Sequence, residues 1–237
     1  MRFYKDKLNV NIDLNVAILT KEQWEQATQI PYDLPFVSDP PYVVFLPATY
    51  GDGVLTAGSK SSKLSVPPAF IQRLRAMGYT YEKGQRENFD FISLHELGHV
   101  ICERISIAEF PGKPNKWLNE FTATYVAYAY LRAKRPKLAL LARIFAEHQL
   151  AVMAKQKYSS LEDFEKLYSN VGPENYGWYQ SKFIQRAAQV YDTEGLSFIE
   201  ELRKFPPPGG KTLPVDTVLA NLEEVAPGFI AWAKTLR

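Results

Sequence analysis

The chain has 237 residues, of which 46% are hydrophobic and 23% are charged, so it is long enough to bury a substantial core. Its formal net charge is +2 and it contains no long basic run, which argues against nucleic-acid binding. Cys102 is the single cysteine, which excludes an internal disulfide framework, and no apolar run is long enough to span a bilayer.

No signal-peptide core follows the first residues, so we expect a cytoplasmic protein by default, although a leader removed beforehand would leave no trace. Apolar and mostly polar residues alternate over residues 8–19, which predicts a half-buried strand. The apolar positions of this segment are Leu8, Val10, Ile12, Leu14, Val16 and Ile18. Thr20 is then expected to cap a short helix that runs through Ala27.

Two further strands are expected before the chain becomes helical. Residues 42–46 form an apolar run that predicts a buried strand, and residues 54–57 predict a short strand after a glycine-rich turn. An extended peptide that paired with an edge of this sheet would use one of these two segments. Pro67 and Pro68 are expected to open a helix that includes Met77. The N-terminal part is therefore predicted to be α+β.

The next helix carries His95-Glu96-Leu97-Gly98-His99, which has the form H-E-x-x-H. Residues four apart lie one turn apart on the same face of a helix, so both imidazoles can bind one Zn²⁺ ion. Glu96 is rotated by about 100° round the helix from His95. It would lie beside such an ion, where it can act as the general base for a metal-activated water.

A catalytic zinc site needs a third protein ligand. Cys102 and Ile105 occupy the positions where a metzincin carries its glycine and its third histidine, which excludes that arrangement. Glu103 lies one further turn along the same helix, too far from the first histidine to share an ion, so we expect a surface charge there. Glu120 follows a reversal over residues 109–114 and lies near the start of a second apolar helix. A chain that reverses direction here can place the carboxylate of Glu120 next to the two histidines.

Beyond residue 111 the sequence is mainly helical in pattern. The segments that predict helices are residues 117–134, 138–157, 161–167, 176–191 and 197–205, and a final segment that contains Trp232.

A family resemblance begins at Glu120. The run Trp117-Leu118-Asn119-Glu120, with the residues that follow it to Tyr125, resembles the W-L-N-E run of aminopeptidase N-type metallopeptidases. More broadly, it resembles the segment that supplies the glutamate zinc ligand in thermolysin-like gluzincins. The chain departs from these enzymes in three places. No G-x-M-E-N segment precedes Leu94, and Thr124 stands where thermolysin-like enzymes carry a supporting aspartate. Residues 100–119 separate the second histidine from Glu120, slightly more than the family's interval, which a longer turn at residues 111–114 could absorb.

This resemblance implies a zinc-dependent peptidase that acts on a peptide or protein substrate. It implies that His95, His99 and Glu120 hold one Zn²⁺ ion and that Glu96 is the general base. The fold that it implies is α+β, with a small mixed-sheet lobe followed by a mainly helical lobe. We expect residues 1–110 to form the first lobe and to carry the zinc helix, and residues 111–237 to form the second lobe and to carry the third ligand.

Residues 175–183 resemble the downstream helix of aminopeptidase-type gluzincins, in which a tyrosine near the helix start faces the zinc. That position implies Tyr176 as the hydrogen-bond donor to the oxyanion of the reaction, with Tyr179 as the alternative. Simple packing of both tyrosines is the competing interpretation, and His148 is the next candidate donor.

Two other classes of function stay open. The chain could bind zinc as a non-catalytic interaction module on a gluzincin-like fold, or it could be a helical structural protein with a fortuitous motif. The zinc content of the protein separates the structural protein from the other two classes, and peptide hydrolysis separates an enzyme from an interaction module.

Overall fold

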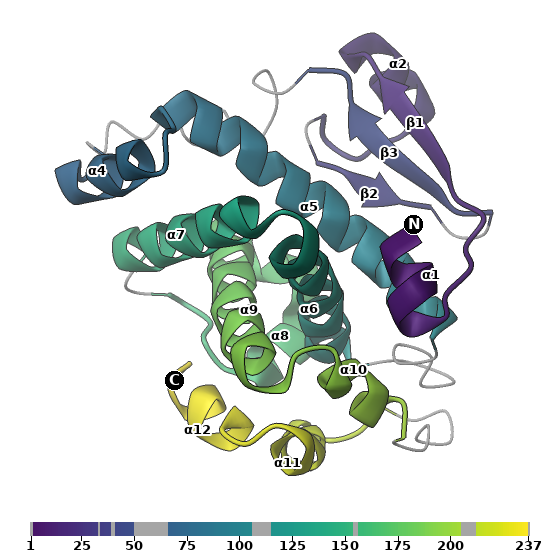
Figure 1. Ribbon diagram of the computed structural model, residues 1–237, viewed down its shortest axis with the longest axis vertical. Helices are drawn as coiled ribbons and strands as arrows, with labels where there is room; N and C mark the ends of the chain where they lie inside the picture. The colour runs from purple at the N-terminus through teal and green to yellow at the C-terminus, as the bar shows by residue number, and fades with distance from the viewer. Residues whose placement is uncertain are drawn as a thin grey trace.

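The computed structural model describes residues 2–32, 34–38, 41–49, 66–105, 115–153, 156–204 and 212–236 (Figure 1). The long helix α5 (Tyr81–Arg104) contacts a small sheet as well as helices α6 and α7. Figure 1 shows the sheet on one side of α5 and the main group of helices on the other. The described part of the chain is therefore α+β and mostly helical.

The other helices follow in chain order. They are α1 (Arg2–Leu8), α2 (Lys21–Ala27), α4 (Pro68–Ala76), α6 (Lys116–Lys134), α7 (Pro136–Val152), α8 (Leu161–Leu167), the 3₁₀ turn η1 (Tyr168–Val171), α9 (Pro173–Glu194), α10 (Ser197–Leu202), α11 (Val215–Val225) and α12 (Phe229–Lys234).

The sheet is mixed and has the strand order β1-β3-β2. The central strand β3 (Val43–Pro47) pairs in parallel with β1 (Asn15–Leu19) and antiparallel with β2 (Phe36–Val37). Because β3 has a neighbour on both sides, the segment 42–46 offers no free edge to a peptide, and that prediction is wrong. The other predicted peptide-binding segment, residues 54–57, lies outside the described residues.

The strand predicted over residues 8–19 is correct only in its second half. Leu8, the first residue of that segment, is the last residue of α1, and the rings of Phe3 and Tyr4 in this helix pack against Tyr130 of α6 with centroids 5.5 and 5.7 Å apart. These aromatic contacts bury the start of the chain against a helix rather than against a sheet.

The alternation of apolar and polar residues over residues 8–19 predicts which side chains are buried only in the first half of the segment. Three of its apolar side chains are buried without strand pairing, namely Leu8, Val10 and Ile12. Pairing with β3 begins at Asn15. There Val16 and Ile18 are 55% and 65% exposed, because no described segment covers their side of β1.

Helix α2 begins where the sequence predicts. The Thr20 side chain accepts a hydrogen bond from the backbone of Gln23 at 3.3 Å, and the Gln23 side chain accepts one from the backbone of Thr20 at 3.0 Å. This reciprocal capping box satisfies two donors that would otherwise lack partners. It fixes the short connection that follows β1.

Helix α6 is buried along most of its length and forms the centre of the helical part. The ring of Phe121 packs edge-on against Phe229 of α12 at 5.2 Å, and the ring of Tyr125 lies 4.6 Å from Phe198 of α10. A helix that is apolar on all sides needs neighbours on all sides. Here α5, α7, α8 and α9 supply further neighbours.

The helix ends differ modestly from the sequence prediction. Helix α7 begins at Pro136 and ends at Val152, not at residues 138 and 157, because proline is well placed at the first helical position. The final helical segment is two helices, since Gly228 with φ of 99° precedes α12. The predicted boundary between the two lobes lies within residues 106–114, outside the described residues. None of the described helices is both long and apolar enough to cross a membrane.

Candidate metal centre

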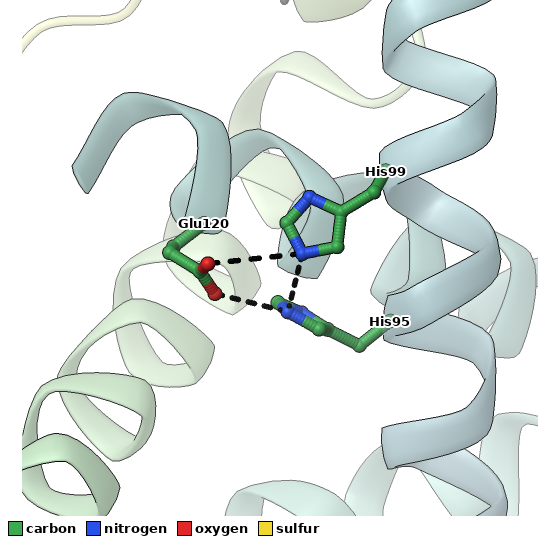
Figure 2. Close-up of side chains that lie close together, drawn as sticks. All are labelled: His95, His99 and Glu120. Carbon is green, nitrogen blue, oxygen red and sulfur yellow. Dashed lines mark hydrogen bonds and ion pairs between the residues drawn. The ribbon is translucent and has the colours of Figure 1, made fainter. Parts of the chain in front are cut away.

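The H-E-x-x-H motif lies in the C-terminal half of α5. Thr80 caps the start of the helix, because its hydroxyl accepts a hydrogen bond from the backbone N–H of Lys83 at 3.2 Å. His95 is buried, and Glu96 and His99 are half-buried. Both imidazoles project from the same face of α5 toward Glu120 of α6 (Figure 2). This is the arrangement that the four-residue spacing predicts.

A glycine lets α5 and α6 approach closely beside the two histidines. A Cβ atom at Gly98 would lie only 2.4 Å from the backbone oxygen of Ala123, which is closer than real Cβ contacts allow. The obstructing atom belongs to the backbone of α6, so no side-chain movement can relieve the clash. Any larger residue at this position must separate the two helices that carry the histidines and Glu120.

We therefore expect Gly98→Ala to destabilise the protein by about 1–3 kcal/mol and to weaken metal binding, since it forces the ligands apart. Urea-induced unfolding and zinc titration measure the two effects. The matched control is Gly84→Ala on the same helix, where the new Cβ would meet only side-chain atoms, the Phe145 ring at 3.3 Å and a Leu74 methyl group at 3.5 Å. A Gly98→Ala variant as stable as Gly84→Ala would contradict this prediction.

Three side chains from the two helices converge at one point. The Nε2 atom of His95 lies 3.1 Å from both the Nε2 atom of His99 and the Oε2 atom of Glu120. The Nε2 atom of His99 lies 3.8 Å from the Oε1 atom of Glu120. Figure 2 shows the carboxylate facing both rings. In the described part of the chain this is the group of His, Cys, Asp and Glu side chains that could hold a metal ion, with ligand atoms within 4.8 Å of one another.

Two of these three separations are close to the value for tetrahedral zinc, and the third, 3.8 Å, is wider. Two ligand atoms that are each about 2.0–2.1 Å from a zinc ion lie roughly 3.3 Å apart at a tetrahedral angle. The contacts of His95 Nε2 with His99 Nε2 and Glu120 Oε2 are 3.1 Å, close to that value. Two imidazoles and one carboxylate are also a ligand set that catalytic zinc uses.

The Nδ1 atoms of His95 and His99, which point away from the cluster, also have hydrogen-bond partners. The Nδ1 atom of His95 lies 3.0 Å from the hydroxyl of Thr124, and the Nδ1 atom of His99 lies 3.3 Å from the amide oxygen of Asn119. When both Nδ1 atoms donate a proton to these oxygens, both Nε2 atoms carry lone pairs. Two lone pairs and a carboxylate facing one another need a positive charge between them, which either a bound metal ion or a proton on His95 can supply.

The electrostatics of Glu120 and His99 agree with metal binding. At His95 burial lowers the pKa, but the hydrogen bond with Glu120 and the negative charges of Glu120 and Glu96 raise it above its ordinary value. Burial by itself would raise the pKa of Glu120, but the hydrogen bond with His95 and the nearby His99 hold it well below its ordinary value. Burial lowers the pKa of His99 to about 4. The carboxylate therefore stays charged and His99 stays neutral at pH 7, and these are the forms that bind metal. Burial, opposed by His95 and helped by the negative charge of Glu120, raises the pKa of Glu96 to about 7.

Glu120 receives further hydrogen bonds from outside α5 and α6. The hydroxyl of Tyr168 in η1 donates to Oε1 at 2.5 Å, and the side-chain amide of Gln180 in α9 donates to Oε2 at 2.7 Å. Burial, together with the nearby carboxylate of Glu120, raises the pKa of Tyr176 of α9 well above its ordinary value. The rings of Tyr168 and Tyr176 are 6.0 Å apart. Tyr176 therefore lies near the cluster of His95, His99 and Glu120, the candidate metal-binding cluster.

The structure places three other candidates away from the cluster. The Tyr179 hydroxyl is occupied elsewhere, since it donates to the backbone oxygen of Ser160 at 2.7 Å. The His148 ring stacks on Phe70 of α4 with centroids 4.0 Å apart. Glu103 is half-buried and accepts a hydrogen bond from Tyr42, so it is not the freely solvated charge that the sequence suggests.

Comparison with protein-family models, with curated proteins and with solved structures finds no match to this chain. The assignment of the site therefore depends on the geometry of the chain and on the motifs that it carries.

Proposed function

We propose that this chain is a zinc-dependent peptidase of gluzincin type. The observation that carries the proposal is the convergence of His95, His99 and Glu120 from two helices. Glu96 follows His95 on the same helix, and its carboxyl group is close enough to His95 and Glu120 for their charges to affect its pKa. The H-E-x-x-H and W-L-N-E motifs supply these four residues, in the chain order of a known class of zinc peptidases and with a slightly longer interval between the second histidine and the glutamate.

The residues present fit the metal, so each can be given a role. His95 and His99 would bind through Nε2, and Glu120 would bind through its carboxylate. A bound zinc ion supplies Lewis acidity, since it polarises a carbonyl group and lowers the pKa of a water molecule from 15.7 to about 7. Thr124 and Asn119 would hold the imidazoles in the tautomer and orientation that binding needs.

Glu96 would move the proton in peptide hydrolysis. Its carboxylate accepts a proton from the attacking water while the water oxygen forms a bond to the peptide carbonyl carbon. The carbon–nitrogen bond then breaks, and the protonated Glu96 returns its proton to the leaving amine. Glu96 is half-buried beside the cluster, which lets a substrate reach it while most bulk water is excluded.

Tyr176 would donate a hydrogen bond to the oxyanion. A donor of this kind contributes about 2.7–4 kcal/mol to the transition state. We expect Tyr176→Phe to lower kcat by about 10²–10³-fold and to leave zinc content and folding unchanged. Steady-state kinetics with elemental analysis of the same sample measures this. Unchanged kcat in Tyr176→Phe would remove Tyr176 from the mechanism.

Digestion of a mixed peptide library tests the proposed function. The purified protein is incubated with the library alone, with a zinc chelator, and with the chelator followed by excess zinc, and products are identified by mass spectrometry. We expect cleavage that the chelator abolishes and zinc restores. A protein that holds one zinc ion per chain without cleaving any peptide would instead be a non-catalytic binding module, and one that holds no metal would be a structural protein.

A further inference from the structure

Tyr168 adopts a backbone conformation that residues with a Cβ atom rarely adopt. Its φ and ψ angles are 51° and −121°. Among the described residues, positive φ at a residue other than glycine occurs only here and at Asn9. Such conformations persist where the surroundings hold them, and they occur most often at functional sites. The conformation at Tyr168 therefore calls for a cause in its contacts.

Contacts on every part of Tyr168 hold this conformation. Its backbone N–H donates to the carbonyl oxygen of Phe164 and so ends α8. Its ring lies 5.6 Å from that of Phe164 and 6.0 Å from that of Tyr176, and Lys116 lies over the ring at 5.7 Å. The hydroxyl at the end of this ring donates to Glu120 at 2.5 Å. The strained turn thus aims the hydroxyl at one oxygen of the carboxylate.

Gln180 acts on the other oxygen. Its amide donates to Oε2 of Glu120 at 2.7 Å, whereas Tyr168 donates to Oε1. Each carboxylate oxygen therefore has a protein donor of its own, and each keeps a lone pair for the face where His95 and His99 lie. Glu120 itself is 1% exposed, so water cannot replace these donors. We call Tyr168 and Gln180 the Glu120 clamp.

We propose that the Glu120 clamp positions the carboxylate for metal binding, and that the strained backbone at Tyr168 is retained for this role. The inference rests on the proposed metal centre and adds two positioning residues to it. A carboxylate held on both oxygens cannot rotate away from the imidazoles, so less conformational entropy is lost when the ion binds. The clamp acts on the ligand, not on the substrate.

Tyr168→Phe tests the clamp, since it keeps the ring contacts and removes only the hydroxyl. We expect its zinc affinity, measured by competition with a chromophoric chelator, to fall by about 10–100-fold. The visible absorption bands of the Co²⁺-substituted protein are expected to shift, because the carboxylate geometry at the ion changes. The matched control is Tyr179→Phe, which removes a tyrosine hydroxyl bonded to the backbone of Ser160 instead of Glu120. Its affinity and spectrum should equal those of the wild type.

Gln180→Met, a substitution of similar shape, is the second variant. It tests the Glu120 clamp even if Tyr168→Phe does not fold. We expect it also to weaken zinc binding by about 10–100-fold. Wild-type affinity and an unshifted Co²⁺ spectrum in the folded clamp variants would overturn this inference while leaving the metal centre intact. A wild-type protein that binds no zinc would instead overturn the metal centre and the clamp together.

Discussion

Glu96→Gln is expected to retain its zinc ion and to cleave peptides about 10²–10⁴-fold more slowly than the wild type. The amide has nearly the shape of the carboxylate, so the packing beside His95 should survive. It cannot accept the proton of the attacking water at neutral pH, and the general base is lost. The measurement is kcat on a peptide identified from the library, together with the zinc content of the same sample.

Glu103→Gln is the matched control for this variant. It changes the same functional group on the same helix, at a residue whose side chain contacts Tyr42 and not the metal-binding cluster. Its kcat should stay within a factor of two of the wild-type value. If Glu96→Gln retained wild-type kcat, Glu96 would not be the base, whereas equal losses in both variants would point to a general effect on α5.

Glu120→Ala is expected to remove zinc binding. Removing a residue that hydrogen-bonds to a metal ligand already lowers the affinity for the metal by about 10–100-fold, and removing the ligand itself should lower it further. A ligand present at 100 times its Kd stabilises a folded protein by about 2.7 kcal/mol. For a chain of this size that corresponds to a rise of roughly 5–11 °C in Tm. Zinc should produce such a rise in the wild type and almost none in Glu120→Ala.

The comparison with Glu103→Ala shows whether the third ligand is assigned correctly. Both variants remove a glutamate near the histidines in sequence, but only Glu120 contacts them in the structure. Glu103→Ala should keep the zinc-dependent rise in Tm, with some loss of stability from the missing bond to Tyr42. The same loss of response to zinc in both variants would contradict the choice of Glu120.

Local sequence signals predicted those parts of the fold that depend on neighbouring residues. Thr20 forms a capping box at the start of α2, and the apolar run at residues 42–46 corresponds closely to β3. The alternation over residues 8–19 was misleading because a buried extended segment need not pair with a strand. Only contacts with distant residues such as Tyr130 show that the start of the chain is helical.

Some residues of the candidate site were also predicted by local sequence signals, and others were not. The four-residue spacing of His95 and His99 predicts that their rings meet, and the resemblance of the W-L-N-E run brings in Glu120. Tyr168 and Gln180 could not be found by such reasoning, because they are 48 and 60 residues from Glu120 in sequence. Gln180 does lie in the segment 175–183 that resembles the downstream helix of the family, but that resemblance implies a role only for a tyrosine. The positive φ of Tyr168 is visible only in the structure.

The metal centre is tested most directly by anomalous diffraction from crystals of the zinc-loaded protein, measured on both sides of the zinc absorption edge. We predict one anomalous peak per chain within about 2.0–2.2 Å of Nε2 of His95, Nε2 of His99 and a carboxylate oxygen of Glu120. A peak bound by other side chains, or no peak at these three residues in protein shown to contain zinc, would contradict the account.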